Sequence, residues 1–365
     1  DELMDRRIEE FCDKTPVSWK EWREGLERDL DDAADDQERQ LNMLRDAHHG
    51  AVFRLLMADL DRRLSTEHLA DHLSALADTV LEVVMGLAWK SLSRKLDGAP
   101  RFAVVAYGKL GGKEYSSDLD LIYLYDDDRM DAGMVYGRLV RRMMNWLTMQ
   151  TSSGRLFEVD LRLRPNGDDG LIVSSFDLWK EYERNKDGKG AWTWELQALT
   201  RARFCAGDSG LGARFEKERR EILRLPRDEK ALASEIVAMR AKMLEGHQNP
   251  TSLFDVKHSR GAMVDIEFVV QYLVLSQSGK HPALLENLGN IKLLVLAGKE
   301  GLIPESLAEA CAGAYRKYRS IQREIRLSKG DGPVRIDPGQ VQEERESVKQ
   351  LWRLVFQTEL PLERS

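Results

Sequence analysis

The chain has 365 residues, of which 42% are hydrophobic, so it is long enough for two or three domains with sizeable cores. Its net charge of −7, from 55 basic and 62 acidic residues, argues against a nucleic-acid polymerase and predicts no nucleic-acid partner. No apolar run approaches the roughly 18 residues that a membrane span needs, and no signal peptide opens the chain. We therefore expect a cytoplasmic protein with no membrane partner, and the three widely spaced cysteines fit a reducing compartment.

The first hundred residues predict helices. Ser65 or Thr66 can cap a helix whose apolar residues keep helical spacing and which ends before Gly98. These apolar residues are Leu69, Leu73, Leu76, Val80, Val84 and Leu87. We therefore place an N-terminal helical linker region at residues 1–98, ahead of a sheet.

The stretch from Arg101 to Asp127, RFAVVAYGKLGGKEYSSDLDLIYLYDD, predicts two strands joined by a glycine-rich turn. Strand alternation places Asp118 and Asp120 on one face of the second strand. Adjacent carboxylates repel each other unless a divalent cation lies between them, and a glycine turn offers backbone N–H groups to phosphates. The stretch therefore predicts a site for a metal-bound nucleoside triphosphate.

Neither motif is specific alone. A lone DxD motif is common in solvated loops, and GKLGG lacks the GK[ST] order and the following helix of a P-loop. These aspartates, however, are embedded in apolar sequence, where an unpaired charge is expensive and a structural purpose is hard to find. That setting favours a functional role.

A third acidic position follows a predicted helix. Apolar residues at Tyr136, Leu139, Val140, Met143 and Leu147 keep helical spacing, so strand, helix and strand succeed one another. The next strand-like run, FEVDLRLRP, carries Asp160, Arg162 and Arg164 at alternate positions, which predicts that they share a face. If this strand lies beside the first aspartate strand, three carboxylates meet around one or two magnesium ions, with two guanidinium groups near the phosphates.

The rest of the chain, from about Gly207, predicts a helical bundle. Trp192 and Trp194 can frame an adenine by stacking, but core positions are the more common role for such residues. Asp265 and Glu267 either help to bind nucleotide or fix the bundle against the sheet by ion pairs, and we favour the structural role.

The chain resembles glutamine synthetase adenylyltransferases, of the DNA polymerase β type nucleotidyltransferase superfamily, in a succession of motifs: YGKLGG, SSDLDLIYLY, TSSGRLFEVDLRLRPNG, AWTWELQALTRAR and FDVKHSRGAMVDIEFVVQYL. The resemblance implies an α+β fold with a mixed, polymerase β-like nucleotidyltransferase sheet at 99–206, flanked by N-terminal helices and a C-terminal helical bundle at 207–365. TSSG, WTWE and DIEFVVQYLVL resemble the adenylylating half of this two-halved family. Because one motif set is present and no methionine opens the chain, we expect a fragment.

The implied reaction transfers AMP from ATP to a tyrosine hydroxyl of glutamine synthetase, under control by PII-type signalling proteins and glutamine. Asp118, Asp120 and Asp160 would be catalytic and would bind the metal, which is two Mg²⁺ ions with Mn²⁺ as the alternative. The expected nucleotide-binding residues are Gly108, Lys109, Gly111, Gly112, Ser117, Arg162 and Arg164. The segment GGKEYSSD is about two residues shorter than is usual in the family, which can alter how this loop reaches the phosphates.

Three alternatives remain. The sister half of the family performs the reverse reaction, phosphate-dependent removal of AMP, with the same fold and aspartates. A different nucleotidyltransferase would modify a nucleic-acid end or a small molecule, against which the acidic charge and the bundle motifs speak. A non-catalytic regulatory docking module, with catalysis impaired by the short loop, is disfavoured because all three aspartates are present.

Overall fold

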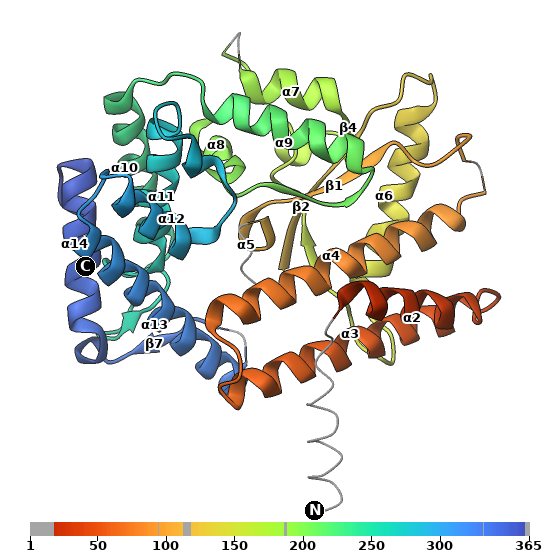
Figure 1. Ribbon diagram of the computed structural model, residues 1–365, viewed down its shortest axis with the longest axis horizontal. Helices are drawn as coiled ribbons and strands as arrows, with labels where there is room; N and C mark the ends of the chain where they lie inside the picture. The colour runs from red at the N-terminus through yellow and green to blue at the C-terminus, as the bar shows by residue number, and fades with distance from the viewer. Residues whose placement is uncertain (1–17, 94, 112–117, 186–187, 331, 362–365) are drawn as a thin grey trace, which may run out of the picture. The chain divides into compact units, whose positions relative to one another are not determined.

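The structure is a computed structural model that describes residues 18–93, 95–111, 118–185, 188–330 and 332–361 (Figure 1). By its internal contacts the chain divides into two compact units. The first comprises Asp1–Gly190 and Ala202–Glu218, and the second comprises Ala191–Arg201 and Arg219–Ser365. The predicted α+β class with helical flanks is confirmed, whereas the domain boundaries drawn from the sequence remain predictions.

The first unit holds the main sheet. Its helices are α2 (Trp19–Asp31), α3 (Gln37–Leu60), α4 (Thr66–Lys90), α5 (Gly108–Gly111), α6 (Ala132–Thr148) and α7 (Phe176–Arg184), with α9 (Ser209–Leu223) belonging to it as far as Glu218. Its strands are β1 (Phe102–Ala106), β2 (Asp118–Tyr125), β3 (Glu158–Asp160), β4 (Ser174–Ser175) and β5 (Arg203–Gly207).

The sheet is mixed, as predicted, with strand order β3-β2-β1-β5 and with β4 also paired to β2. Strand β1 pairs antiparallel with β2 and β5, whereas β2 pairs parallel with β3 and β4. The central strand β1 is apolar and buried at all five positions, as expected for a strand covered on both faces. Figure 1 shows α4 and α7 on opposite sides of β1 and β2.

Strand alternation decides which face carries the aspartates. Leu119, Leu121 and Tyr123 of β2 lie in the core that α4 and α6 share with the sheet. Because successive side chains point to opposite faces, Asp118 and Asp120 belong to the face turned away from that core. Burial of the apolar face thus determines the register of the strand, and the register determines which face carries the aspartates.

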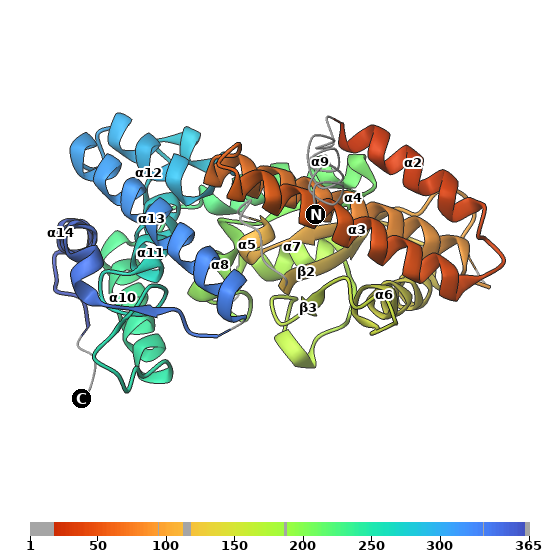
Figure 2. The same ribbon diagram turned by 90° about the horizontal axis from the view of Figure 1, so that it is seen from below.

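Helix α4 is the central helix of this core and was predicted from its spacing. Ser65 is its N-cap, with the side chain accepting the N–H of His68, and twelve of its residues are buried. By length and composition alone α4 could cross a membrane, but 61% of its most apolar window is buried inside the protein. Helices α2, α3 and α4 pack against one another (Figures 1 and 2), so α4 is a core helix.

The second unit is mainly helical, as predicted. Its elements are α8 (Thr193–Leu199), the end of α9, α10 (Glu229–Gly246), β6 (Phe254–Asp255), α11 (Met263–Gln277), α12 (Gly289–Lys299), α13 (Glu305–Lys329), β7 (Arg335–Ile336) and α14 (Gln342–Phe356). Figure 2 shows α10, α11, α13 and α14 alongside one another. The β6–β7 pair was not predicted, because two residues leave no alternation to detect.

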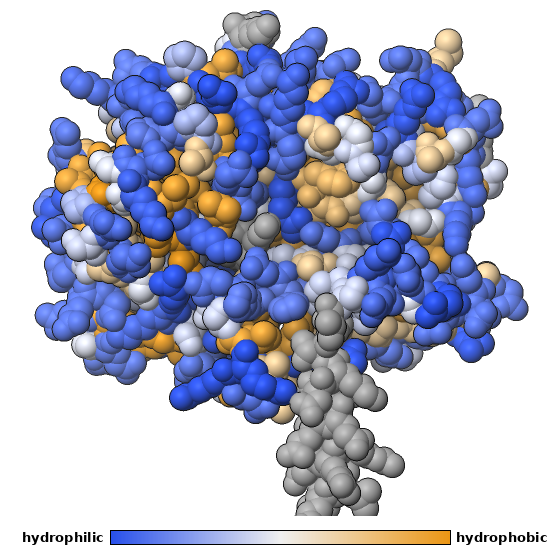
Figure 3. Space-filling view, viewed as in Figure 1, coloured by the Kyte–Doolittle hydropathy of each residue, from blue (hydrophilic) through white to orange (hydrophobic). Residues whose placement is uncertain are grey.

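Hydrophilic residues cover most of the face drawn in Figure 3, and hydrophobic residues appear in smaller areas between them.

Inside the second unit, Arg240 and Asp265 are fully buried and paired at 2.5 Å. Asp265 also accepts the N–H of Gly261. Asp265 therefore forms an ion pair inside the bundle, whereas its predicted role in fixing the bundle against the sheet stays a prediction.

Candidate functional site

The three predicted aspartates come together through strand register. In the parallel pair of β2 and β3, Asp120 lies opposite Asp160 and Asp118 lies opposite Glu158. Partners in register project from the same face of a sheet, so Asp118, Asp120 and Asp160 line one face. The predicted adjacency of the two aspartate strands is confirmed.

The glycine turn closes over Asp120. Gly108 has a φ of +54°, and a Cβ built on it would lie 1.9 Å from Oδ2 of Asp120. The backbone N–H of Tyr107 also donates to the Asp120 carbonyl at 2.8 Å. A side chain at position 108 would therefore displace the carboxylate, and only glycine satisfies both the φ and the space.

The turn itself is the short helix α5 rather than an open loop. The Gly111 N–H donates to the Tyr107 carbonyl at 2.8 Å, so this group is not available to a phosphate, contrary to the prediction. The physical reason is that the N–H that closes a helical turn bonds to the carbonyl four residues before it. Gly112 and Ser117 lie outside the described residues.

Lys109 follows Gly108 and approaches the first aspartate. Its Nζ lies 3.8 Å from Oδ1 of Asp118, whose side chain is 58% exposed. A surface pair of this length contributes little to stability, so both groups can be redirected when a ligand arrives.

Arg162 binds Asp160 directly. The Arg162 backbone N–H donates to Oδ1 at 2.8 Å, and its Nε donates to Oδ2 at 2.8 Å. These hydrogen bonds, with the guanidinium charge, lower the pKa of Asp160. The carboxylate is therefore held ionised at the edge of the sheet.

The prediction that Asp160, Arg162 and Arg164 share a strand face is wrong. Strand β3 ends at Asp160, and the chain then turns, with the Arg164 N–H donating to the Leu161 carbonyl. The aspartate side chain captures the N–H two residues ahead, an alternative to strand pairing. Arg164 donates its Nη1 to the Leu161 carbonyl at 2.8 Å and thereby braces the turn.

The three carboxylates fit a divalent cation in donor type and in register, because Mg²⁺ and Mn²⁺ prefer oxygen ligands. Within the described residues, however, no group of three or more His, Cys, Asp or Glu side chains is placed to hold a metal ion. Asp160 is engaged by Arg162, so one of its oxygens would have to exchange partners before it completed such a site.

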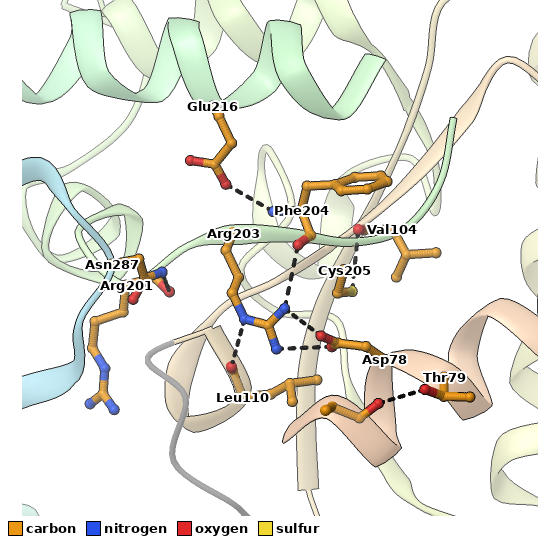
Figure 4. Close-up of polar contacts among 11 residues, drawn as sticks. Asp78, Thr79, Val104, Leu110, Arg201, Arg203, Phe204, Cys205, Glu216 and Asn287 are labelled. Atoms are coloured by element: carbon orange, nitrogen blue, oxygen red, sulfur yellow. Dashed lines mark hydrogen bonds and ion pairs between the residues drawn. The ribbon is translucent and has the colours of Figure 1, made fainter. Parts of the chain in front are cut away.

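Arg203 supports the glycine turn through the Leu110 carbonyl, as Figure 4 shows. Its guanidinium forms two hydrogen bonds with Asp78 of α4, at 2.7 and 2.9 Å, and its Nε donates to the Leu110 carbonyl at 3.2 Å. One side chain of β5 thus ties α4 to α5. No local pattern in the sequence indicates this role, since the two partners are 93 and 125 residues away.

A second arginine, Arg45 of α3, supports the segment before β3. Its side chain is fully buried and donates to the carbonyls of Leu41, Trp146, Met149 and Gly154 at 2.7–2.9 Å. A guanidinium satisfies several orphan carbonyls at once because its five N–H groups form a rigid fork. Arg45 therefore holds the TSSG turn from which β3 departs.

The core position predicted for the two tryptophans is wrong. Trp192 is 70% exposed and Trp194 is 44% exposed. They lie at the start of α8, where buried Glu195 accepts the Trp192 N–H at 2.8 Å. This cap turns the polar side chain inward and leaves the indoles outside the packed face.

Comparison with known proteins gives a consistent result. The family model for glutamate-ammonia ligase adenylyltransferase matches residues 1–218. Bifunctional glutamine synthetase adenylyltransferase/adenylyl-removing enzymes are 51% identical in Bordetella bronchiseptica, 48% in Burkholderia mallei and 46% in Nitrosomonas europaea. These matches cover 97%, 97% and 88% of the chain, but only 38%, 39% and 36% of the relatives. The chain thus spans little more than a third of the length of these relatives.

Proposed function

Because the chain belongs to the glutamate-ammonia ligase adenylyltransferase family, we propose that it transfers AMP from ATP to a tyrosine hydroxyl of glutamine synthetase, releasing pyrophosphate. The observation that carries the proposal is the register of Asp120 with Asp160, under the turn at Gly108. The partner enzyme, the tyrosine acceptor and the direction of the reaction belong to the proposal.

Asp118 and Asp120 would bind the magnesium of ATP. Asp160 would join them once Arg162 releases one oxygen of the Asp160 carboxylate. A bound divalent cation supplies charge neutralisation at the transferred phosphate and lowers the pKa of a nearby hydroxyl. The lowered pKa of Asp160 suits a metal ligand better than a base, because a weakly basic carboxylate removes a phenolic proton poorly.

The phosphates would be held by Lys109, by donors of the glycine turn other than the Gly111 N–H, and by Arg162 once it leaves Asp160. Asp120 would keep its orientation through the close approach of Gly108. Orientation of the α-phosphate for in-line attack is the main contribution that such a site makes to phosphoryl-group transfer.

We further propose regulation by PII-type proteins and glutamine, and a cytoplasmic location. The alternative reaction is phosphate-dependent removal of AMP from adenylylated glutamine synthetase, since the names of the relatives include both activities. TSSG and the segment around Trp192 and Trp194 favour the adenylylating direction through their resemblance to that half of the family.

The test is incubation with unmodified glutamine synthetase, Mg²⁺ and ATP labelled in the α-phosphate. We expect label on a synthetase tyrosine, and no label with Asp118→Asn/Asp120→Asn or with EDTA. Replacing Mg²⁺ by Mn²⁺ in the same assay determines which ion is used. Absence of label, together with ADP release from adenylylated synthetase and phosphate, would support the reverse reaction. If neither labelled synthetase nor ADP is formed, the result would contradict an active transferase in this chain.

A further inference from the structure

The second unit has a pocket of about 290 Å³ built from four segments of its own chain. His247 follows α10, Lys257 and His258 follow β6, Arg326 lies near the end of α13, and Arg335 begins β7. The volume is just below the range of pockets that enclose drug-sized molecules, so it fits a small ligand.

The lining is strongly cationic. Lys257, Arg326 and Arg335 all line the pocket, and none forms an ion pair with a carboxylate of the described residues. Asp255 is the acidic side chain among the lining residues, and it is only 6% exposed. Its Oδ1 accepts the N–H groups of Lys257 and His258 at 2.9 and 3.0 Å, so it shapes the turn that presents them.

Three buried nitrogens of this lining lack hydrogen-bond partners in the part of the chain that the structure describes: Nδ1 of His258, Nε of Arg326 and Nε of Arg335. Buried polar atoms in native proteins are nearly always hydrogen-bonded, so three such nitrogens around one pocket call for an acceptor that the chain does not supply. If carboxylates of the protein paired with these arginines, their Nε atoms would not lack hydrogen-bond acceptors.

The two histidines add a fixed wall. Their rings stack with centroids 4.0 Å apart and an interplanar angle of 12°, and Nδ1 of His247 lies 3.0 Å from the Met243 carbonyl. Burial, with the nearby charges of Lys257 and His247, lowers the pKa of His258 to about 4. At neutral pH His258 is therefore uncharged, and Lys257, Arg326 and Arg335 bring positive charge to the pocket.

We propose that this pocket binds a small anion that carries phosphate groups. Two guanidinium groups offer paired donors that match the oxygens of a phosphate, and the ammonium adds a third positive charge, so a di- or trianion suits the site better than a single carboxylate. The inference rests on residues of the second unit and does not depend on the proposed function.

The test uses inorganic pyrophosphate as the probe and isothermal titration calorimetry on the whole chain in EDTA. We expect Arg326→Gln/Arg335→Gln to weaken binding about tenfold or more, because each charge-assisted hydrogen bond is worth at least about that factor. The matched control is Lys292→Gln/Lys299→Gln, which removes two exposed charges of α12 and should leave affinity unchanged.

A second variant, Lys257→Gln, should also weaken binding and keeps both arginines if the double variant unfolds. Unchanged affinity in folded variants would overturn the proposal. So would loss of binding in Lys109→Gln without loss in the arginine variant, since the anion would then bind at the first unit.

The source of the phosphate is distinguished by competition with ATP in the same buffer. If ATP displaces pyrophosphate from the native chain and fails to bind the arginine variant, the pocket receives the triphosphate of the nucleotide. If ATP binds both proteins equally while pyrophosphate binding is lost in the variant, the pocket receives a separate phosphorylated molecule or free anion. Both results support the pocket, and the transfer assay described above tests the proposed function separately.

Discussion

Gly108 and Asp120 lie so close that a single methyl group on Gly108 would occupy the place of the Asp120 carboxylate. The contact joins the turn after β1 to the strand that carries the acidic pair. It is set by backbone geometry, since Gly108 also has a left-handed φ. The position of one candidate metal ligand therefore depends on the absence of a side chain elsewhere.

Gly108→Ala should abolish most AMP transfer, because the added methyl group displaces Asp120. The strained φ should lower the free energy of unfolding by about 1–2 kcal/mol. The measurements are labelled transfer and urea unfolding. The control is Gly86→Ala in α4, where an added Cβ meets nothing within 4 Å and helix propensity should improve slightly. Full activity in Gly108→Ala would show that the carboxylate position is not critical.

Arg162→Gln should change the pH dependence of transfer. Arg162 lowers the pKa of Asp160, so without it the pKa rises toward the ordinary value of about 4. As pH falls, Asp160 is then protonated at a higher pH, so the acid limb of the activity profile should move to higher pH. Arg155→Gln is the matched control, because it removes an equal charge paired with exposed Glu158. An unmoved acid limb in Arg162→Gln would contradict a role for ionised Asp160.

Arg203→Gln should raise the KM for ATP, because the Leu110 carbonyl loses its donor and the glycine turn loses its support. It should also cost about 1–3 kcal/mol of stability, since partly buried Asp78 loses its ion pair with Arg203. The double variant Asp78→Asn/Arg203→Gln separates the two effects. The double variant should regain the free energy of unfolding, measured by chemical denaturation, but its KM for ATP should stay raised. Recovery of both together would mean that Arg203 acts only through the ion pair.

His48 should make the first unit sensitive to mild acid. Burial and the neighbouring charge of His49 lower its pKa to about 3, whereas the unfolded chain has a value near 6.5. Below pH 6.5 the unfolded state binds more protons, so stability falls with pH until the folded-state pKa is reached. The expected loss between pH 7 and pH 5 is about 2 kcal/mol.

His48→Leu should remove much of this pH dependence, because His48 packs on Phe157 and its two ring nitrogens lack partners in the described residues. The comparison is urea unfolding of the native chain and the variant at pH 7 and pH 5. An equal loss of stability in both proteins would assign the acid sensitivity to other groups.

The sequence could predict what depends on local periodicity. The caps and spacing of α4, the apolar spacing of α6 and the alternation around Asp118 and Asp120 each depend on residues a few positions apart. The mixed sheet was implied by the motif resemblance and is confirmed. The strand pattern gave the adjacency of Asp160 only as a condition, and the register of β2 with β3 meets it.

What the sequence could not predict depends on competition or on distance. Asp160 captures the N–H of Arg162 and ends β3, although the alternation of apolar and polar residues continues. Arg203 finds Asp78 across 125 residues, which no local pattern reveals. Trp192 and Trp194 look like core residues by composition, yet the helix cap at Glu195 decides their exposure.

The second unit is discontinuous, and this affects the order in which the newly made chain can fold. The ribosome completes every residue of the first unit at Glu218, but by then it has also made α8, which belongs to the second unit. Gln197 of α8 is bonded to Gln271, and the Arg201 carbonyl accepts from Asn287, both of which emerge later. During that interval α8 has no finished partner, so a chain that stalls there would expose this segment to chaperones and proteases.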